Sequence, residues 1–187
     1  MKHLLELAKN IKDKSLRKNV EDMLKDFRLS NKEFDFPKSD INKTPAGIGG
    51  FHHCQEGGLI QHTRAVTEMC MKCAGVVEKV YSIKLNKDYV IAGALLHDIA
   101  KIYEYVKANG AWGHSGIKFD HSFMIGTELY ARGFPEELVH IVESHLGQSA
   151  NPPRTIEALI LHHIDTLDAI IGSSTEENLL HCLLNDG

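Results

Sequence analysis

Apolar residues recur at steps of three and four along most of the chain, and strict alternation of apolar and polar residues never lasts more than a few positions. This periodicity is typical of amphipathic α-helices rather than of half-buried strands. The helices that it predicts cover residues 4–29, 59–81, 88–106, 119–131, 135–146 and 155–171, with a final short helix in TEENLLHCLL. We therefore predict an all-α fold, a single-domain helical bundle.

Two polar, glycine-containing stretches interrupt the helical pattern and predict loops. They are SNKEFDFPKSDINKTPAGIGG at residues 30–50 and ANGAWGHSG at residues 108–116. A loop as long as the first one often carries function in a compact domain. We expect residues 1–50 to form a helical extension and loop that pack on a main domain of residues 51–187, so that both parts make one compact domain.

The composition is that of an ordinary soluble protein. The chain has 187 residues, enough for one domain with a proper hydrophobic core, and 43% of them are hydrophobic. Twenty-five acidic residues against 21 basic ones give a net charge of −4, which argues against a strong nucleic-acid surface. A small phosphorylated ligand remains compatible with this charge, because a metal ion can supply positive charge locally.

The sequence predicts neither membrane insertion nor a disulfide framework. The N-terminus lacks the unbroken apolar core of a signal peptide, and the longest apolar run, residues 89–96, is too short to span a bilayer. The four cysteines are few and scattered, so we expect a cytoplasmic protein. Cys70 and Cys73 form a CxxC pair that no second pair answers, and we expect them to pack in a core.

The stretch ALLHDIAK places a histidine and an aspartate, His97 and Asp98, in the middle of an otherwise apolar helical pattern. Burying an unpaired carboxylate costs several kcal/mol, about 3–5 kcal/mol when a buried pair loses one partner, so such a group normally faces a cation, a donor network or a metal. Asp98 is therefore the first candidate for chemistry in this chain.

Five successive predicted helices each carry at least one residue of a type that can bind a metal ion. The six residues concerned are His62, His97, Asp98, His121, His145 and Asp165. Metal sites of helical bundles are built from side chains on facing helices. Spacing alone leaves open whether these side chains meet, because a lone histidine at a helix end is more often a cap or a surface residue.

The order of a histidine, an HD dipeptide and a distant aspartate resembles the defining pattern of the HD superfamily of metal-dependent phosphohydrolases. The segments FHHCQEGGLIQHT, ALLHDIAK, SHLG and LHHIDTLDA resemble the HD domain of the YhaM-type 3′-to-5′ exoribonucleases and of related stand-alone HD proteins. Two features depart from that pattern. The chain has SHLG where the related motif often reads SHHG, and residues 1–50 do not resemble the OB-fold of those exoribonucleases, which makes RNA a less expected substrate.

The resemblance implies a metal site with a defined ligand set. One ion would be held by His62, His97, Asp98 and Asp165. In the subgroups with two metals, His121 and His145 would hold the second ion, and Asp98 would bridge both. Imidazole and carboxylate ligands suit one or two divalent transition metals from among Mn, Fe, Ni, Co and Zn. Such ions lower the pKa of a bound water, make hydroxide available near neutral pH and neutralise phosphoryl oxygens.

Further residues receive roles around this site. Lys101 shares a helix face with Asp98, and in the family the lysine of an HD-x-x-K motif lies near the substrate phosphate, so we expect both residues to serve catalysis. His52 and His53 are expected to contact substrate, although loop histidines are usually exposed and a lysine at a helix end is often solvated. 

Two more residues lie on the predicted helix that carries Asp165. We expect His162 to orient the Asp165 carboxylate, and Asp168 either to do the same or to contact a nucleotide sugar. The remaining histidines look like ordinary surface residues, namely His3, His114, His140 and His181.

The function that these expectations support is that of a metal-dependent phosphohydrolase acting on a nucleotide or a related small phosphate ester. A phosphodiesterase that trims RNA 3′ ends or opens a cyclic nucleotide is the alternative within the enzymes. A module that binds metal and nucleotide without turnover is the alternative from another class, but it would not need to keep all six ligand residues. The sequence leaves the oligomeric state open.

Overall fold

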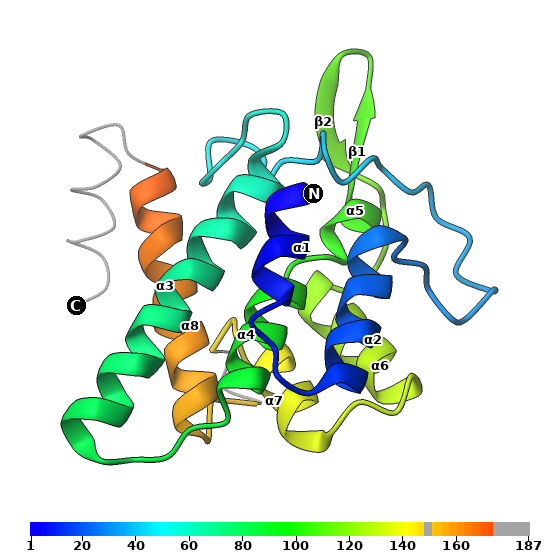
Figure 1. Ribbon diagram of the computed structural model, residues 1–187. Coiled ribbons are helices and arrows are strands. Elements are labelled where there is room, and N and C mark those ends of the chain that lie inside the picture. The colour runs from blue at the N-terminus through cyan, green and yellow to red at the C-terminus, as the bar shows by residue number, and fades with distance from the viewer. Residues whose placement is uncertain (148–150, 174–187) are drawn as a thin grey trace.

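The computed structural model describes residues 1–147 and 151–173, and these fold into helices with one small β-hairpin (Figure 1). In chain order the elements are α1 (Lys2–Ala8), α2 (Lys14–Lys25), α3 (Gly58–Tyr81), α4 (Lys87–Leu96), α5 (Lys101–Glu104), β1 (Tyr105–Ala108), β2 (Ala111–His114), α6 (His121–Ala131), α7 (Glu136–Glu143) and α8 (Ile156–Gly172). The prediction of a mainly helical bundle is confirmed.

Helix α4 is the central element of the bundle. It packs against α3, α7 and α8, and also against α1 and α2. Its residues from Val90 to Leu96 are all buried, as expected for a helix that is apolar on every face. Gly93 permits close approach to α7, because a Cβ atom there would lie 2.7 Å from Cγ2 of Ile141.

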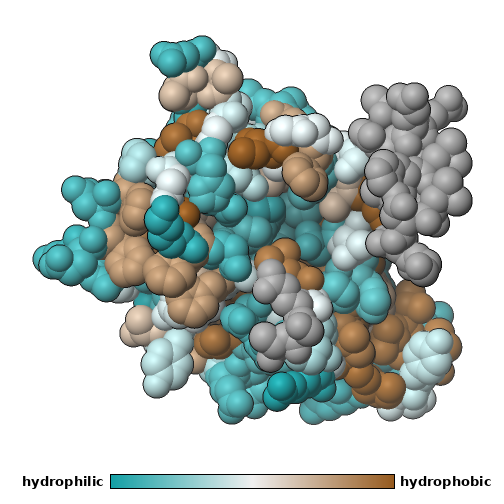
Figure 2. All heavy atoms as spheres, turned by 180° about the vertical axis from the view of Figure 1, so that it is seen from behind, coloured by the Kyte–Doolittle hydropathy of each residue, from teal (hydrophilic) through white to brown (hydrophobic). Residues whose placement is uncertain are grey.

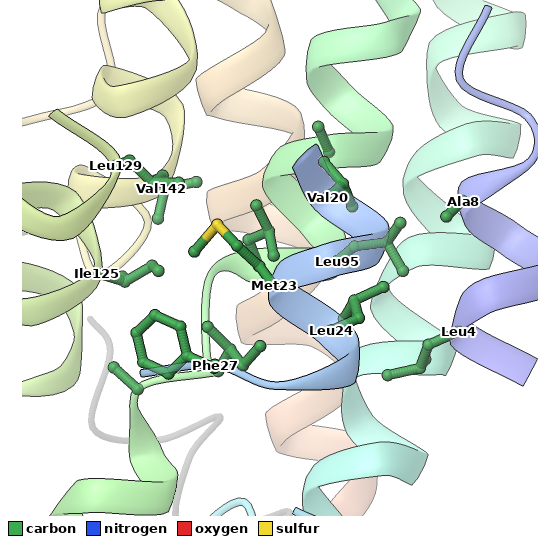
Figure 3. Close-up of a cluster of buried hydrophobic side chains, with 14 of the residues drawn as sticks. Leu4, Ala8, Val20, Met23, Leu24, Phe27, Leu95, Ile125, Leu129 and Val142 are labelled. Carbon is green, nitrogen blue, oxygen red and sulfur yellow. The ribbon is translucent and has the colours of Figure 1, made fainter. Parts of the chain in front are cut away.

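The N-terminal helices complete the hydrophobic core (Figure 3). Leu4 of α1 and Met23 of α2 belong to the same buried cluster as Leu95 of α4 and Ile125 of α6. The carboxylate of Asp88, at the start of α4, accepts hydrogen bonds from the backbone N–H groups of the α1–α2 turn. Residues 1–25 therefore pack directly on the helices that carry the candidate site.

The long loop between α2 and α3 is held down at several points. Ser30 contacts the buried carboxylate of Glu128 on α6, and Ser39 donates through its backbone N–H to the carbonyl of Ile102. Phe34 of the loop packs on Phe119, with ring centroids 5.8 Å apart.

The face opposite to the one seen in Figure 1 has apolar areas that are separated by hydrophilic ones, so its apolar surface is not continuous (Figure 2).

The N-terminal helical stretch breaks where the sequence predicted continuity. Helix α1 ends at Ala8 and α2 begins at Lys14, because the side chain of Asp13 accepts hydrogen bonds from the N–H groups of Ser15 and Leu16 and so starts a new helix. The final predicted helix, TEENLLHCLL, lies outside the described residues.

The helix predicted over residues 88–106 was too long. It ends at Leu96, a turn covers residues 97–100, and the chain then forms α5 and the antiparallel hairpin β1–β2. Asn109 and Gly110 connect the strands with φ angles of 51° and 83°. A two-residue Asn-Gly connection of this kind matches the twist of a hairpin, and it is the sequence signal that distinguishes this hairpin from the predicted helix and loop.

Among the described residues, no helix combines the length and the apolar character needed to cross a membrane.

Candidate metal centre

Six side chains predicted from the sequence converge on one buried place between the helices. Helix α3 supplies His62, the end of α4 supplies His97 with the adjoining Asp98, and the last three come from α6, the turn after α7, and α8: His121, His145 and Asp165. The histidines and Asp98 are at most 8% exposed. The structure therefore brings together all six residues of the expected ligand set.

The first group of ligand atoms surrounds Nε2 of His62. This nitrogen lies 2.9 Å from Oδ1 of Asp165 and 3.2 Å from Nε2 of His97. It also lies 3.2 Å from Oδ2 of Asp98. The ligand atoms of His62, His97 and Asp98 all lie within 4.8 Å of one another, and Oδ1 of Asp165 also lies 3.5 Å from Nε2 of His97. Such a set of imidazole and carboxylate atoms could hold a divalent ion.

The second group surrounds the other oxygen of Asp98. Oδ1 of Asp98 lies 3.1 Å from Nε2 of His121 and 3.7 Å from Nε2 of His145. All three atoms are buried, and none has a hydrogen-bond partner within residues 1–147 and 151–173. Unpaired buried polar atoms are costly, so three that face one another fit a cation between them. Asp98 is the residue that both groups share.

The local backbone explains how His97 and Asp98 reach the centre. They lie in the turn after α4 rather than within a helix, and here N–H groups bond to carbonyls three residues earlier, as in the bond from Lys101 to Asp98. This pattern tightens the chain relative to an α-helix. The sequence pattern predicts the HD pair within a helix because the surrounding residues are apolar on every side.

In each of the four histidines, Nδ1 has a partner outside the centre and Nε2 faces inward. Nδ1 of His97 lies 2.9 Å from the carbonyl oxygen of Ala94, and Nδ1 of His145 lies 2.6 Å from that of Val142. Both partners are acceptors, so Nδ1 donates, which leaves Nε2 as the atom of each ring that can bind an ion.

In His62 and His121, the partner of Nδ1 is a carboxylate instead of a backbone carbonyl. Oδ2 of Asp168 lies 2.7 Å from Nδ1 of His62, and Oε2 of Glu104 lies 2.8 Å from Nδ1 of His121. Carboxylate partners of this kind fix the orientation of metal-binding imidazoles. Asp168 is 4% exposed, so its position suits this orienting role better than the predicted contact with a sugar.

Lys101 is buried beside Asp98 rather than solvated. Its Nζ lies 2.7 Å from Oδ2 of Asp98, and the residue is only 5% exposed. Burial would raise the pKa of Asp98, but Lys101 and the neighbouring imidazoles outweigh it and hold this pKa well below its usual range. Asp98 is therefore a carboxylate, the form that binds a cation.

The protonation of two imidazoles differs for physical reasons. Burial by itself lowers the pKa of His62, but three carboxylates outweigh burial and raise this pKa well above its usual range: those of Asp165, Asp168 and Asp98. Burial lowers the pKa of His145 to about 3, with the neighbouring His97 adding to the effect. His145 is thus a neutral imidazole, ready to act as a ligand.

The two loop histidines pack over His62. The ring centroids of His52 and His62 are 4.8 Å apart, and Nδ1 of His52 lies 3.3 Å from Nδ1 of His53. His53 is 6% exposed, has a φ of 48° and donates through its N–H to the carbonyl of Gly172. These residues are therefore at the site rather than free in solvent, with His52 the more accessible of the two.

The expectation for His162 needs adjustment. Nδ1 of His162 lies 2.7 Å from the carbonyl oxygen of His145, so this ring contacts backbone there instead of the Asp165 carboxylate.

His140 is half-buried and accepts from the N–H of Arg154, whereas His3 and His114 are exposed. His181 lies outside the described residues. Cys70 is buried, which raises the pKa of its thiol, in accord with a packing role.

The HD domain family model matches residues 59–170, which contain all six residues of the centre. The chain belongs to the HD domain family. The predicted superfamily is confirmed, and so is its class of enzyme, a phosphohydrolase.

Three relatives of this HD protein differ in how much of their length they share with it. Dihydroneopterin 2′,3′-cyclic phosphate phosphodiesterase of Methanocaldococcus jannaschii is 43% identical over 175 residues, which cover 92% of this chain and 70% of that protein. The 3′-5′ exoribonuclease YhaM of Geobacillus sp. is 32% identical over 157 residues, or 76% of this chain and 44% of the relative. YhaM of Listeria monocytogenes is 31% identical over 150 residues, or 72% and 45%. Comparison with solved structures gave no significant match.

Proposed function

We propose that this protein is a metal-dependent phosphodiesterase that opens a cyclic phosphate ester on a small nucleoside-like or pterin-like compound. The observation that carries the proposal is the position of Asp98, whose two oxygens face two separate groups of buried ligand atoms. A carboxylate shared by two ions is a common arrangement in enzymes that hydrolyse phosphate esters.

The ligand assignment follows from the two groups. His62, His97, Asp98 and Asp165 are assigned to one ion, and His121, His145 and Asp98 to the other. Because imidazoles dominate the set, we expect Mn, Fe, Ni, Co or Zn rather than Mg or Ca. When bound, such ions acidify water and neutralise the charge that builds on phosphoryl oxygens.

Three residues near the proposed ions are assigned roles in binding the substrate. Hydrolysis of a cyclic phosphodiester forms one bond from water oxygen to phosphorus, breaks one P–O ester bond, and transfers a proton to the departing oxygen. Lys101 places a buried ammonium group beside Asp98 and so attracts the anionic phosphate toward the centre. We assign His52, half-buried above His62, to contact with the substrate, and His53 to holding that loop against α8.

Two observations favour a small cyclic ester over RNA. The relative that shares the greater part of its length with this chain is named for a cyclic phosphate, whereas the chain spans less than half of either exoribonuclease. The net charge of −4 also gives little general attraction to a polyanion. Activity on RNA 3′ ends is the alternative that the test must separate.

The test compares substrates with protein loaded with Mn, Fe, Ni, Co or Zn. Dihydroneopterin 2′,3′-cyclic phosphate, nucleoside 2′,3′-cyclic phosphates, 3′,5′-cyclic nucleotides, phosphomonoesters and a short RNA are incubated with wild type and with Asp98→Asn. We expect wild type to convert a 2′,3′-cyclic phosphate to a phosphomonoester without releasing inorganic phosphate, and Asp98→Asn to be inactive. Release of inorganic phosphate from monoesters alone, or of mononucleotides from RNA with cyclic esters untouched, would contradict the proposal.

A further inference from the structure

We propose that Glu104 is a positioning residue of the metal centre, which holds the His121 imidazole so that its Nε2 faces Asp98. This inference rests on the proposed function, because it takes His121 to be a ligand of the second ion. Oε2 of Glu104 lies 2.8 Å from Nδ1 of His121, and on the opposite edge of the ring Nε2 lies 3.1 Å from Oδ1 of Asp98. Glu104 was not among the residues that the sequence pattern singled out.

The position of His121 in its helix explains why a side chain is needed. His97 and His145 follow the ends of α4 and α7, where Nδ1 reaches a backbone carbonyl three residues earlier. His121 is instead the first residue of α6, and the start of a helix presents free N–H groups rather than carbonyls. The acceptor that the His121 ring lacks from its own helix comes from Glu104.

The burial of Glu104 supports the same role. The residue is 9% exposed, and within the described part of the chain its carboxylate pairs with two histidines, His121 and His114. Oε1 faces Nε2 of His114 at 3.4 Å, while Oε2 faces His121. A buried carboxylate is costly unless a partner compensates its charge. For Glu104 one such partner is an imidazole of the candidate centre, as a positioning role requires.

The β-hairpin fixes the backbone of Glu104. Glu104 is the last residue of α5 and directly precedes β1, and its carbonyl accepts from the N–H of Ser115, just after β2. Tyr105 and His114 are paired in the hairpin register. The hairpin projects from the bundle beside α5 (Figure 1), and Glu104 lies at its base. The backbone of Glu104 is therefore tied to the segment that follows β2.

The experiment measures metal bound per chain and metal affinity after loading with Mn, in wild type, Glu104→Ala and Glu104→Gln. The amide of Gln keeps an oxygen that can accept from Nδ1, so it serves as the conservative rescue. We expect Glu104→Ala to lose the second ion, and Glu104→Gln to keep it with an affinity lowered by about 10- to 100-fold, the usual cost of altering such a partner.

Glu128→Gln is the matched control. Glu128 is also a buried carboxylate and lies on the same helix as His121, but it pairs with Ser30 and Arg132. We expect this variant to retain the metal content of wild type even if its melting temperature falls.

The results separate the two proposals. If wild type binds two ions and both Glu104 variants bind two with unchanged affinity, the positioning role is wrong while the proposed function stands. If wild type binds no transition metal, the proposed function itself fails. Should Glu104→Ala not fold, the affinity of Glu104→Gln relative to Glu128→Gln decides, because a loss confined to Glu104→Gln supports the positioning role and equal affinities overturn it.

Discussion

Lys101 and Asp98 form a buried ion pair with Nζ and Oδ2 2.7 Å apart, one helical turn from each other in the sequence and at the middle of the candidate centre. The other oxygen of the same carboxylate has no hydrogen-bond partner within the described part of the chain and faces two imidazoles. Asp98 therefore contacts Lys101 and also belongs to both groups of ligand atoms.

Replacing Lys101 by methionine keeps most of the length of the side chain and removes its charge. We expect kcat/KM for the cyclic ester to fall by about 10²- to 10³-fold, the size found when one preorganised group is removed from an active site. Metal content should stay at the wild-type level, because the ligand atoms are untouched. Lys107→Met, which alters an exposed ion pair with Glu56, is the control and should leave both quantities unchanged.

Single replacements of the second histidine group test the division into two sites. His121→Ala and His145→Ala should each lower the bound metal from about two ions per chain toward one, since each removes a ligand of one ion only. Asp98→Asn should lower both. The measurement is elemental analysis after loading and dialysis. Full metal content in both histidine variants, with only KM raised, would mean that the two rings merely line the substrate pocket.

The close packing of α8 against the His52–His53 loop gives a test away from the ligands. A Cβ atom on Gly172 would lie 2.1 Å from ring atoms of His53, so Gly172→Ala must displace that ring. We expect KM to rise, with metal content unchanged. Gly75→Ala on α3, where a Cβ atom meets nothing within 4 Å, is the control and should behave as wild type. An unaltered KM in Gly172→Ala would show that the loop does not serve binding.

Loading the metal-free protein should release protons. The raised pKa of His62 means that its ring holds a proton when no ion is present, and an incoming ion must displace that proton. Metal affinity should therefore increase as the pH rises toward and above neutrality. Calorimetry in two buffers of different ionisation enthalpy measures the protons released. Binding without proton release at neutral pH would contradict this assignment of the His62 protonation state.

Much of the fold follows from local pattern. The predicted helix over residues 59–81 differs from α3 by one residue at its start, because apolar spacing and the preceding glycines define it. The break after Leu96 was not predicted, since residues on every side of it are apolar and a periodicity cannot show where an all-apolar helix ends. The hairpin was missed because its Asn109-Gly110 turn lies in a stretch that reads as a polar loop.

The candidate site could likewise be predicted only in part. The six proposed ligands could be named because their order along the chain resembles a family pattern, and their role as ligands stays a prediction. Their supporting contacts could not be found from sequence, since Asp168 meets His62 across 106 positions and Glu104 meets His121 across 17. Only the folded chain shows which carboxylate faces which ring.

Anomalous diffraction from crystals of the Mn-loaded protein tests the central claim most directly. We predict two peaks about 3.5–4 Å apart, the separation typical of two-metal hydrolytic sites, with the Asp98 carboxylate between them. The peaks should lie beside Nε2 of His62 and beside Nε2 of His121. A single peak under saturating Mn, or peaks away from Asp98, would contradict the account.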